Sequence, residues 1–553
     1  MDNYAVAKIL DEVGDLLEVQ GEAPFRVRAY HKAADSIRGL GEDINKVSDE
    51  ARLETIQAIG KSLASHITEL LETGKMEFFE DLKGSMPPEA MGLLRVPGLG
   101  PRRARQLYKE LNVKTIEDLR SALNAQRLRD LRGMSARTEV NLRKGLDELD
   151  RVRDRILLYE GWPVAQGILE QLRRDACVAR AEMVGSLRRM QETIGGIDIL
   201  VATDSSESVI SLFCRLPQVE EISKREDKRA VIVVQPGLGV DLRVVRPNEF
   251  GSALQYFTGS TCHNSRLRQL AQAKGLVRDG HKVARVTTGE SIDFVDEGDI
   301  YAALGMDHVP APLREDRGEI EAGQSDSLPR LIRLDDVRGD LHVHSRWSDG
   351  LSSVRQIGIE ACEQGLEYVC ISDHAVNLRI AGGLTVDELR QRDEEIARVN
   401  AELGGAVTVL SGIELNIDNE GLVDYPNDFL ARFDVVTASV HGGFGQATDQ
   451  LTKRVIKAVE NPAVDIIAHP TGRLIGRRPA YNIDMEAVIS AAAATGTVLE
   501  LNAFPDRLDL NDLYLRKAKE RRVRISIATD AHHRSHLRYM FYGIATAQRG
   551  WLE

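Results

Sequence analysis

The feature that most constrains the fold is a repeat in the last third of the chain, where seven short apolar runs are separated by segments with helical periodicity. The runs are residues 340–344, 368–374, 407–414, 434–441, 464–469, 497–502 and 524–530. An alternation of strand and helix folds as a parallel sheet covered by helices, and about seven units close most naturally as a barrel. Nearly every run ends in a histidine or a carboxylate. Because the carboxyl ends of barrel strands line one face, these side chains are expected to meet in one pocket.

The side chains that should meet have the chemistry of a metal site. They are His342, His344, Asp349, His374, Glu414, His441, His469, Asp530 and His532. Imidazole and carboxylate together suit manganese, zinc or iron, and the absence of cysteine argues against a structural zinc site. Nine donors exceed what one ion takes, so two or three ions are expected, with Glu414 or Asp530 bridging them. Such ions activate water and hold the oxygens of a phosphate. The alternative is a set of ordinary histidines that are hydrogen-bonded within a core.

Residues 334–553 resemble the PHP (polymerase and histidinol phosphatase) domain. The likeness is carried by motifs at residues 340–350, 372–374, 412–414, 439–441, 469–473 and 529–532. It implies a phosphoesterase with two or three Mn or Zn ions on a distorted (β/α)7 barrel, and His344, His374 and Glu414 as catalytic residues. Arg473 is a candidate for holding a substrate phosphate through its planar guanidinium. The alternative is a surface arginine that pairs with a carboxylate.

Bulk composition limits what the remainder of the chain can be. At 553 residues the chain is too long for one core. It has no apolar run of membrane-spanning length and no signal-like N-terminus, and its five cysteines form no C-x-x-C pair. We therefore expect a cytoplasmic protein with reduced thiols and no membrane partner. The net charge of −13 argues against a generally DNA-binding surface, although local basic patches can still bind DNA.

A glycine turn at residues 96–101 lies between two helical segments, and a basic helix follows it. Glycines let the backbone approach a ligand closely, and the next helix offers unpaired amides with a favourable dipole. The pattern resembles a helix-hairpin-helix motif, which holds a DNA phosphate whatever the base sequence. A weaker copy lies at residues 59–64. The candidate DNA-binding residues are Gly60, Gly98, Gly100, Arg102, Arg103 and Arg105. The alternative is that Gly98 only caps a helix.

Residues 1–310 resemble the family X DNA polymerases, which are gap-filling repair enzymes. The motifs that carry the likeness are residues 25–34, the two hairpins, and residues 184–189, 240–243 and 256–264. By resemblance, the incoming nucleotide is bound by Gly185, Ser186, Arg189, Tyr256, Phe257, Gly259 and Asn264. With the PHP segment included, the likeness to bacterial family X polymerases covers essentially the whole chain.

The chain departs from this family at the polymerase metal site. The mechanism needs three carboxylates to hold two Mg or Mn ions. Gly196 stands where the first carboxylate belongs, which leaves Asp198 and Asp241 as the catalytic ligands. We predict weak metal binding there, and nucleotide addition that is severely impaired or depends on high manganese. The alternative is rescue by Glu192, although its spacing places it in a loop.

A second departure concerns abasic-site lyase chemistry, for which some family members use a lysine in the first hairpin. His66 stands at that position, and Lys61 lies a turn away. Imidazole cannot form the stable iminium that an amine forms, so lyase activity is not expected.

The expected architecture is multidomain, with α and α/β parts. The domains are a helix-hairpin-helix domain (1–83), a fingers-like helical domain (84–148), a nucleotidyltransferase-like palm (149–250), a nucleotide-selecting thumb (251–310), a polar linker (311–333) and the PHP domain (334–553). We expect a monomeric DNA repair enzyme acting on gapped, nicked or abasic DNA, with dNTP as a second partner. Its leading activity would be a manganese-dependent 3′–5′ exonuclease, together with abasic-site cleavage. The alternatives are an active gap-filling polymerase with PHP proofreading, a phosphatase of small phosphomonoesters, and a scaffold without catalysis.

Overall fold

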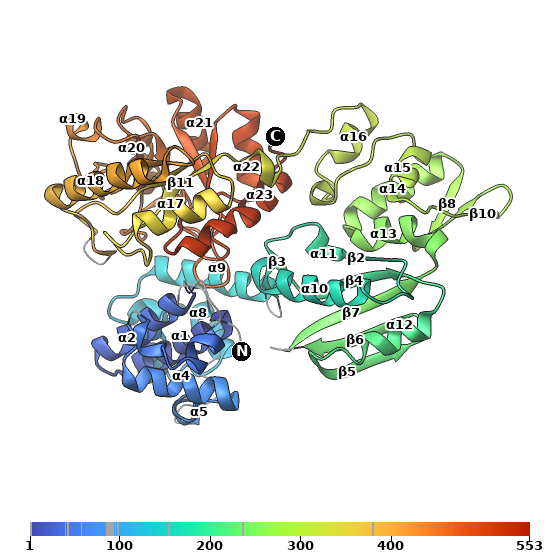
Figure 1. Cartoon of the computed structure of the whole chain (residues 1–553), viewed down its shortest axis with the longest axis horizontal. Coiled ribbons are helices and arrows are strands. Elements are labelled where there is room, and N and C mark those ends of the chain that lie inside the picture. Colours follow the sequence, from blue (N-terminus) through green and yellow to red (C-terminus); the bar gives the residue numbers. More distant parts are fainter. Residues whose placement is uncertain are drawn as a thin grey trace. The chain divides into compact units, whose positions relative to one another are not determined.

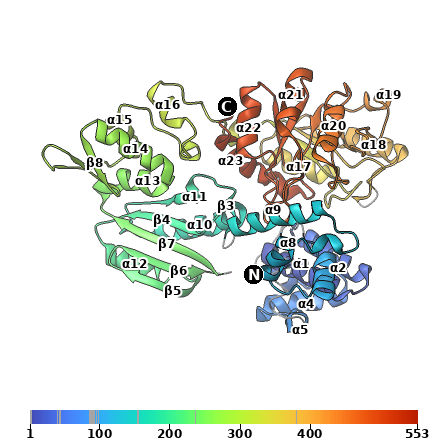
Figure 2. The ribbon, with the colours of Figure 1, turned by 180° about the vertical axis from the view of Figure 1, so that it is seen from behind.

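The protein divides into two compact units (Figures 1 and 2). The computed structural model describes residues 3–38, 40, 44–56, 58–84, 93, 96, 99–152, 155–234, 237–378 and 381–553. The first unit comprises Met1–Arg153, Asp335–Leu510 and Arg521–Met540, and the second comprises Asp154–Leu334, Asn511–Glu520 and Phe541–Glu553. Among the described helices, none combines the length and the apolar character that a bilayer span requires.

The N-terminal part of the first unit is helical and has two separate cores. Its elements are α1 (Asn3–Gln20), α2 (Pro24–Arg38), α3 (Ile44–Asp49), η1 (Leu53–Thr55), α4 (Lys61–Thr73), α5 (Glu77–Gly84), α7 (Pro101–Leu111), α8 (Ile116–Asn124), η2 (Leu128–Asp130) and α9 (Ala136–Val152). Val6, Leu10, Val13 and Leu17 recur at three- and four-residue spacing on α1, and all four are buried. One core draws on residues 6–82 and the other on residues 93–146. Each hairpin therefore has a core of its own.

The barrel completes the first unit, and it confirms the predicted strand–helix alternation. Seven parallel strands follow in chain order: β11 (Gly339–Val343), β12 (Tyr368–Ile371), β13 (Thr408–Asn416), β14 (Val435–Ser439), β15 (Ile466–Ile467), β16 (Val498–Asn502) and β17 (Ile525–Ala528). Val343 and Ala531 form a parallel bridge beyond β11 and β17, which nearly closes the barrel. The short helices η5 (Leu334–Asp336) and η7 (Arg534–Tyr539) flank it. Around the strands lie α17 (Val354–Glu363), α18 (Val386–Leu403), α19 (Asn427–Leu430), α20 (Thr448–Val459) and α21 (Met485–Thr495) (Figure 1).

The second unit begins with a mixed sheet. Its elements are β1 (Ile156–Leu157), α10 (Leu158–Arg173), β2 (Arg180–Val184), α11 (Gly185–Arg188), β3 (Thr193–Ile194), β4 (Ile197–Ala202), α12 (Ser206–Phe213), β5 (Val219–Glu226), β6 (Arg229–Val234) and β7 (Leu238–Val245). The five-stranded sheet has the order β2-β4-β7-β6-β5, and only β4 and β7 run parallel. Asp198 on β4 lies opposite Asp241 on β7. The register thus brings together the two carboxylates that the sequence predicted for this site.

A small helical region with a three-stranded sheet follows the palm sheet. Its elements are η3 (Pro247–Glu249), α13 (Phe250–Thr258), α14 (Thr261–Ala273), β8 (Leu276–Asp279), β9 (Lys282–Arg285), β10 (Ser291–Ile292), α15 (Glu297–Ala303), η4 (Ala311–Leu313) and α16 (Glu319–Gln324). The last two helices fall within the predicted linker, and Leu313 and Ile320 are buried in the core of this region. Residues 311–324 are therefore not an extended linker.

The polar composition of this segment misled the sequence prediction because two of its charged side chains are buried against partners. The guanidinium of Arg314 is fully buried against Glu297, and Glu319 lies 2.7 Å from His263 in the interior. Two further helices complete the second unit, α22 (Asp512–Glu520) and α23 (Met540–Arg549). Trp551, just after α23, joins the same core as Leu313.

Candidate metal centre and nucleotide site

All nine predicted metal ligands lie at the carboxyl ends of barrel strands or in the loops that follow them. His342 and Glu414 lie near the carboxyl ends of β11 and β13, whereas Asp349 lies in the loop after β11. His469 and Asp530 have positive φ angles of 30° and 52°. Residues other than glycine rarely adopt this conformation, and such strain concentrates at functional sites. The structure therefore brings together side chains that are up to 190 residues apart in sequence.

Glu414 is at the centre of the cluster. Its Oε2 atom lies 2.9 Å from Nδ1 of His374, 3.4 Å from Nε2 of His342 and 3.5 Å from Nε2 of His344. Its Oε1 atom lies 3.2 Å from Nε2 of both His441 and His469. One buried carboxylate thus faces five imidazoles, which is the arrangement expected of a bridging ligand.

Two further carboxylates complete the set. Oδ1 of Asp530 lies 3.2 Å from Nε2 of His344, and Oδ2 of Asp349 lies 3.4 Å from Nε2 of His532 and 3.5 Å from Nε2 of His374. The donor atoms form three overlapping groups, and the atoms of each group lie within 4.8 Å of one another: His344–Asp349–His374–His532, His342–His344–Asp530 and His374–Glu414–His441. This spacing supports the expectation of more than one ion.

The donor set fits bound cations better than an ordinary hydrogen-bonded core. Within the described part of the chain, Nε2 of His342, both ring nitrogens of His344, Nδ1 of His374 and Nδ1 of His469 are buried without a hydrogen-bond partner. Buried polar atoms without partners are costly and rare. Burial alone would raise the pKa of Glu414, but His374, His441 and His342 hold that pKa well below its usual value. The cluster therefore offers charged oxygens and free imidazole nitrogens to a metal.

Two residues on β16 support the cluster, and the sequence interpretation missed both. Nδ1 of His342 lies 2.7 Å from Oε1 of Glu500, and the amide of His469 donates to Oε2 of Glu500 at 2.6 Å. Asn502 donates to Oδ2 of Asp530 at 3.0 Å. Such contacts fix the orientation of a ligating imidazole or carboxylate. The sequence does contain one signal for Glu500, because it is a carboxylate inside the apolar run 497–502.

Arg473, the predicted phosphate-binding residue, contacts the loop that contains Arg507 and Leu508. Its guanidinium donates from Nε to the carbonyl oxygen of Arg507 at 2.8 Å and from Nη2 to that of Leu508. It thereby holds the backbone of a neighbouring loop, a role that neither interpretation of the sequence included. Arg507 is the arginine at the cluster, because its Nε lies 3.3 Å from Oδ2 of Asp530.

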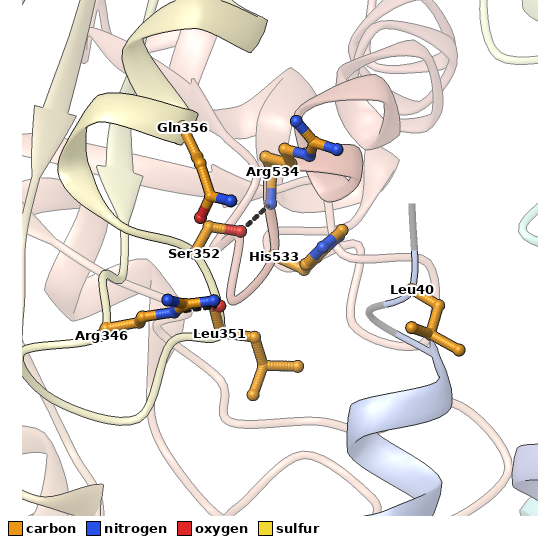
Figure 3. A pocket seen from close by; sticks show the side chains of 7 residues that line it. All are labelled: Leu40, Arg346, Leu351, Ser352, Gln356, His533 and Arg534. Atoms are coloured by element: carbon orange, nitrogen blue, oxygen red, sulfur yellow. Dashed lines mark hydrogen bonds between the residues drawn. The ribbon is translucent and has the colours of Figure 1, made fainter. Parts of the chain in front are cut away.

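A separate pocket of about 310 Å³ lies beside the ligand loops (Figure 3). It is lined by Leu40, Arg346, Leu351, Ser352, Gln356, His533 and Arg534. In Figure 3 the side chain of Arg346 reaches Leu351, to whose carbonyl oxygen its Nε donates at 2.8 Å. The amide of Arg534 donates to Oγ of Ser352 at 3.0 Å, and that of Leu351 donates to the carbonyl oxygen of His532 at 2.6 Å. These contacts brace the two ligand-bearing loops against each other, and the pocket wall contains none of the nine predicted ligands.

The palm carboxylates have a different environment. Asp241 accepts two hydrogen bonds from Nε and one from Nη2 of Arg229, at 2.8–3.2 Å, and a further one from Arg243 at 3.2 Å. Burial and the neighbouring Asp241 raise the pKa of Asp198 to about 6. Gly196 contributes no side-chain donor, and Glu192 lies near Arg155, which feels its charge. Asp241 is neutralised by arginines, so these side chains do not fit the two-ion site of a polymerase as they stand.

Of the predicted nucleotide-binding residues, Gly185 and Arg189 lie near Asp198. Gly185 has a φ of 66°, and a Cβ atom there would lie 2.4 Å from Oδ2 of Asp198. Nη1 of Arg189 donates to the carbonyl oxygen of Thr258 at 2.5 Å and lies against Gly259. Asn264 donates to the carbonyl oxygen of Tyr256 at 2.8 Å, and the ring of Phe257 packs edge-on against Tyr256. Ser186 is half-buried on α11 next to Gly185.

Both hairpins present a helix N-terminus without a side-chain cap. Gly60 precedes α4 and Gly100 precedes α7, and a Cβ atom at either position would meet nothing within 4 Å. Arg102 and Arg103 are exposed on the first turn of α7, whereas the guanidinium of Arg105 lies against Gly21. Gly98 lies outside the described residues. The open amides suit a phosphate group.

His66 packs among aromatic side chains of the first helical core. Its Nδ1 atom lies 3.0 Å from the hydroxyl of Tyr30, and its ring stacks on Phe78 with centroids 5.1 Å apart. Burial lowers the pKa of His66. Lys61 begins α4, one turn before His66.

Known protein families match four stretches of the chain. These are a helix-hairpin-helix domain over residues 1–76, a SAM-like helix-hairpin-helix tandem over residues 91–148, the DNA polymerase beta thumb over residues 253–315 and the PHP domain over residues 340–503. These matches confirm the hairpins and the PHP barrel that the sequence motifs predicted.

Individual proteins extend the similarity over the whole chain. The DNA polymerase/3′-5′ exonuclease PolX of Bacillus subtilis is 36% identical over 555 residues, which cover 100% of this chain and 96% of that protein. A probable phosphatase of Thermoanaerobacter sp. is 34% identical over 205 residues, or 35% of this chain and 78% of that protein. DNA polymerase lambda of Rattus norvegicus is 23% identical over 348 residues, or 57% of this chain and 55% of that protein.

Proposed function

Because the chain belongs to the bacterial PolX family, the family X DNA polymerases that carry a PHP domain, we propose that it is a DNA repair enzyme whose stronger activity is nucleolytic. The barrel would act as a manganese-dependent 3′–5′ exonuclease and would also cut at abasic sites. The palm would add nucleotides weakly. The hairpins would hold gapped, nicked or abasic DNA through its phosphates.

The observation that carries the proposal is the contact of Glu414 with five histidines. When bound, manganese ions would lower the pKa of a water and offset the charge of a phosphodiester. The chain's own residues would prepare the site for this. Glu500 orients His342 and His469, and Asn502 orients Asp530. Arg507 adds a positive charge beside Asp530, where the phosphate of a DNA strand would approach.

Weak polymerase activity follows from the palm contacts. Gly196 supplies no oxygen donor, and Asp241 is already paired with Arg229. Two ions held without a bridging carboxylate repel each other, so the second would bind weakly. An active gap-filling polymerase with PHP proofreading remains the alternative, and it requires Arg229 to release Asp241 when metal and nucleotide bind.

The test uses labelled single-nucleotide-gapped DNA and manganese, with and without dNTPs. We expect the wild-type protein to shorten the primer. His344→Ala should abolish shortening, with a loss of at least about 10³-fold, because three carboxylate contacts converge on this imidazole. The variant should bind the DNA as the wild type does. An Asp241→Ala protein serves as the control for the palm site. Undiminished cleavage by His344→Ala would refute the assignment, and rapid primer extension that Asp241→Ala abolishes would favour the alternative.

A phosphatase of small phosphomonoesters is a second candidate, and the similarity of residues in the barrel to probable phosphatases favours it. Comparing hydrolysis of a chromogenic phosphomonoester with hydrolysis of gapped DNA decides between the two. The phosphatase is favoured if excess DNA competes poorly with the monoester.

A further inference from the structure

An ion-pair network connects the predicted nucleotide site to the last helix of the chain. Oε1 of Glu315 accepts from Nε of Arg189 at 2.9 Å, from Nε2 of Gln191 at 2.6 Å and from Nη1 of Arg549 at 3.0 Å. Nη1 of Arg549 also donates to the carbonyl oxygen of Arg189 at 2.9 Å. Arg549 therefore contacts both the backbone of Arg189 and the carboxylate that holds the Arg189 side chain.

The network continues to the start of α22. Nη2 of Arg549 donates to Oδ2 of Asp512 at 2.7 Å, and Arg317 donates to the same oxygen at 2.9 Å. The Arg549 side chain is only 5% exposed. Burial would raise the pKa of Glu315, but Arg549 and Arg189 hold it below its usual value. The contacts of Arg549 are thus charged and shielded from solvent, which makes them stronger than surface ion pairs.

The contributing helices are firmly packed within the second unit. The ring of Tyr542 on α23 packs edge-on against Tyr159, and that of Phe541 packs against Trp162. Beyond α23, Trp551 is buried in the thumb core. Asp512 and Arg549 lie after residue 503, where the match to the PHP domain ends. A segment that follows the PHP match therefore completes the surroundings of a palm residue.

The charges of the network leave Arg189 able to bind an anion. Three guanidiniums and two carboxylates give a net charge of +1. Nη2 of Arg189 has no hydrogen-bond partner among the described residues, whereas its Nε and Nη1 are both held. Without Arg549, the remaining charges of the network would sum to zero and Glu315 would pair with Arg189 alone. Arg549 thus keeps Arg189 both oriented and electrostatically available.

We propose that Arg549 and Glu315 are positioning residues that hold Arg189 for the triphosphate of an incoming nucleotide. The C-terminal helix is then part of the nucleotide-binding apparatus of the palm, in addition to its place after the PHP segment. This inference rests on the proposed function in one respect, since it requires that the palm still binds a dNTP.

The experiment measures nucleotide binding directly, so that slow catalysis does not obscure it. Full-length protein is loaded with single-nucleotide-gapped DNA whose primer ends in a dideoxynucleotide and carries phosphorothioate linkages. Dissociation constants are then measured for dATP and for dAMP. Arg549→Met keeps the apolar stem and removes the guanidinium. We expect it to raise the dATP dissociation constant about tenfold, the effect of losing one charge-assisted hydrogen bond, with dAMP binding unchanged.

Two further variants separate positioning from simple folding. Arg549→Lys keeps the charge but cannot bridge two carboxylates, so it should restore only part of the dATP affinity. Arg538→Ala removes an exposed arginine just before α23, together with its pair to Glu360, and should leave both constants unchanged. Exonuclease activity of all variants on an unmodified primer shows that the barrel is folded, and unchanged dAMP binding shows that the palm is folded.

The outcomes distinguish a failure of the positioning role of Arg549 from a failure of the proposed function. Equal dATP binding by wild type and Arg549→Met would overturn the positioning role while leaving the proposed function intact. A parallel loss of dATP and dAMP binding would also overturn it, because that result indicates a general structural role. If the wild-type protein binds no dATP, the polymerase part of the proposed function fails, and the positioning role fails with it.

Discussion

The barrel and the palm both contain clustered carboxylates, but the basic side chains around them differ: histidines in the barrel and arginines in the palm. In the barrel, Glu414 is faced by imidazoles, several of whose nitrogens have no hydrogen-bond partner among the described residues. In the palm, Asp241 is faced by the guanidiniums of Arg229 and Arg243. An imidazole can give up its proton and leave the negative charge for a metal, whereas a guanidinium is permanently charged and neutralises it. The same acidic side chain is thereby prepared for a cation in one region and occupied in the other.

Other carboxylates of the second unit follow the palm pattern. Glu297 is buried between Arg188, Arg314 and His308, and Glu315 between Arg189 and Arg549. The contrast teaches that the number of acidic residues in a motif does not indicate a metal site; the neighbouring bases decide it. Removing a carboxylate should therefore cost stability in the second unit and metal affinity in the barrel.

The largest expected effect is on stability, at Glu297. Glu297→Gln leaves the buried guanidinium of Arg314 and the half-buried one of Arg188 without their anion, and we expect a loss of about 3 kcal/mol. The thermal transition of the unit should fall by roughly 8 °C, measured by calorimetry. Glu321→Gln is the matched control because its pair with Arg266 is exposed.

The pH dependence of this effect has a definite sign. Arginine contacts outweigh burial and hold the folded-state pKa of Glu297 well below its usual value. Its contribution is therefore present above the unfolded pKa of about 4.3 and is lost as the pH falls below it. The difference between wild type and Glu297→Gln should narrow in acid. A difference that stays constant down to pH 3 would show that shape, and not charge, is what Glu297 supplies.

The sequence predicted those features of the sites that a short stretch of residues specifies, and it did not predict pairings between distant segments. The clustering of the nine candidate ligands was predictable because each follows an apolar strand, and a parallel barrel brings strand ends together. Glu500 and Asn502 lie on such a strand as well, but a single carboxylate inside an apolar run does not reveal which imidazole it orients. The pairing of Asp241 with Arg229 depends on the register of β6 with β7, which no local pattern specifies.

The packing of the predicted linker and the contacts of Arg473 were not predictable, for the same reason. Residues 311–324 are polar in sequence, yet Arg314 and Glu319 find buried partners more than fifteen and fifty residues away. Arg473 follows the His469 motif closely, yet its guanidinium donates to the backbone of residues 507 and 508. Composition predicts exposure only when charged groups have no partner in the fold.

An intermediate effect is expected on metal binding, at Glu500. Glu500→Gln keeps the size of the side chain but removes the charge that orients His342 and His469. Loss of such a supporting contact weakens metal binding about 10- to 100-fold, which isothermal titration of Mn²⁺ into the chelator-treated protein measures. Glu402→Gln, whose partner Arg355 is exposed, is the control. Unaltered affinity would mean that packing alone orients the two imidazoles.

The smallest expected effect is a gain in polymerase activity, produced by changes in the palm. Gly196→Asp restores the missing donor, and φ at this position lies outside the left-handed region. The new Cβ would lie 3.2 Å from the carbonyl oxygen of Gly239, so β7 must shift slightly. Asp241 would still be held by Arg229, and the single change should therefore help little.

Combining Gly196→Asp with Arg229→Gln should leave Asp241 paired with Arg243 alone and raise the single-nucleotide gap-filling rate on the order of tenfold. Gly195→Asp adds the same charge one residue away, where the new Cβ would lie 3.6 Å from Nη1 of Arg155, and should give no gain. If the wild type already fills gaps as fast as the double variant, Asp198 and Asp241 suffice for metal binding. In that case, pairing with a guanidinium does not prevent a carboxylate from binding metal. A gain in the double variant, but not in Gly196→Asp alone or in Gly195→Asp, would establish that Arg229 and the missing donor at residue 196 together make the palm a weaker metal site than the barrel.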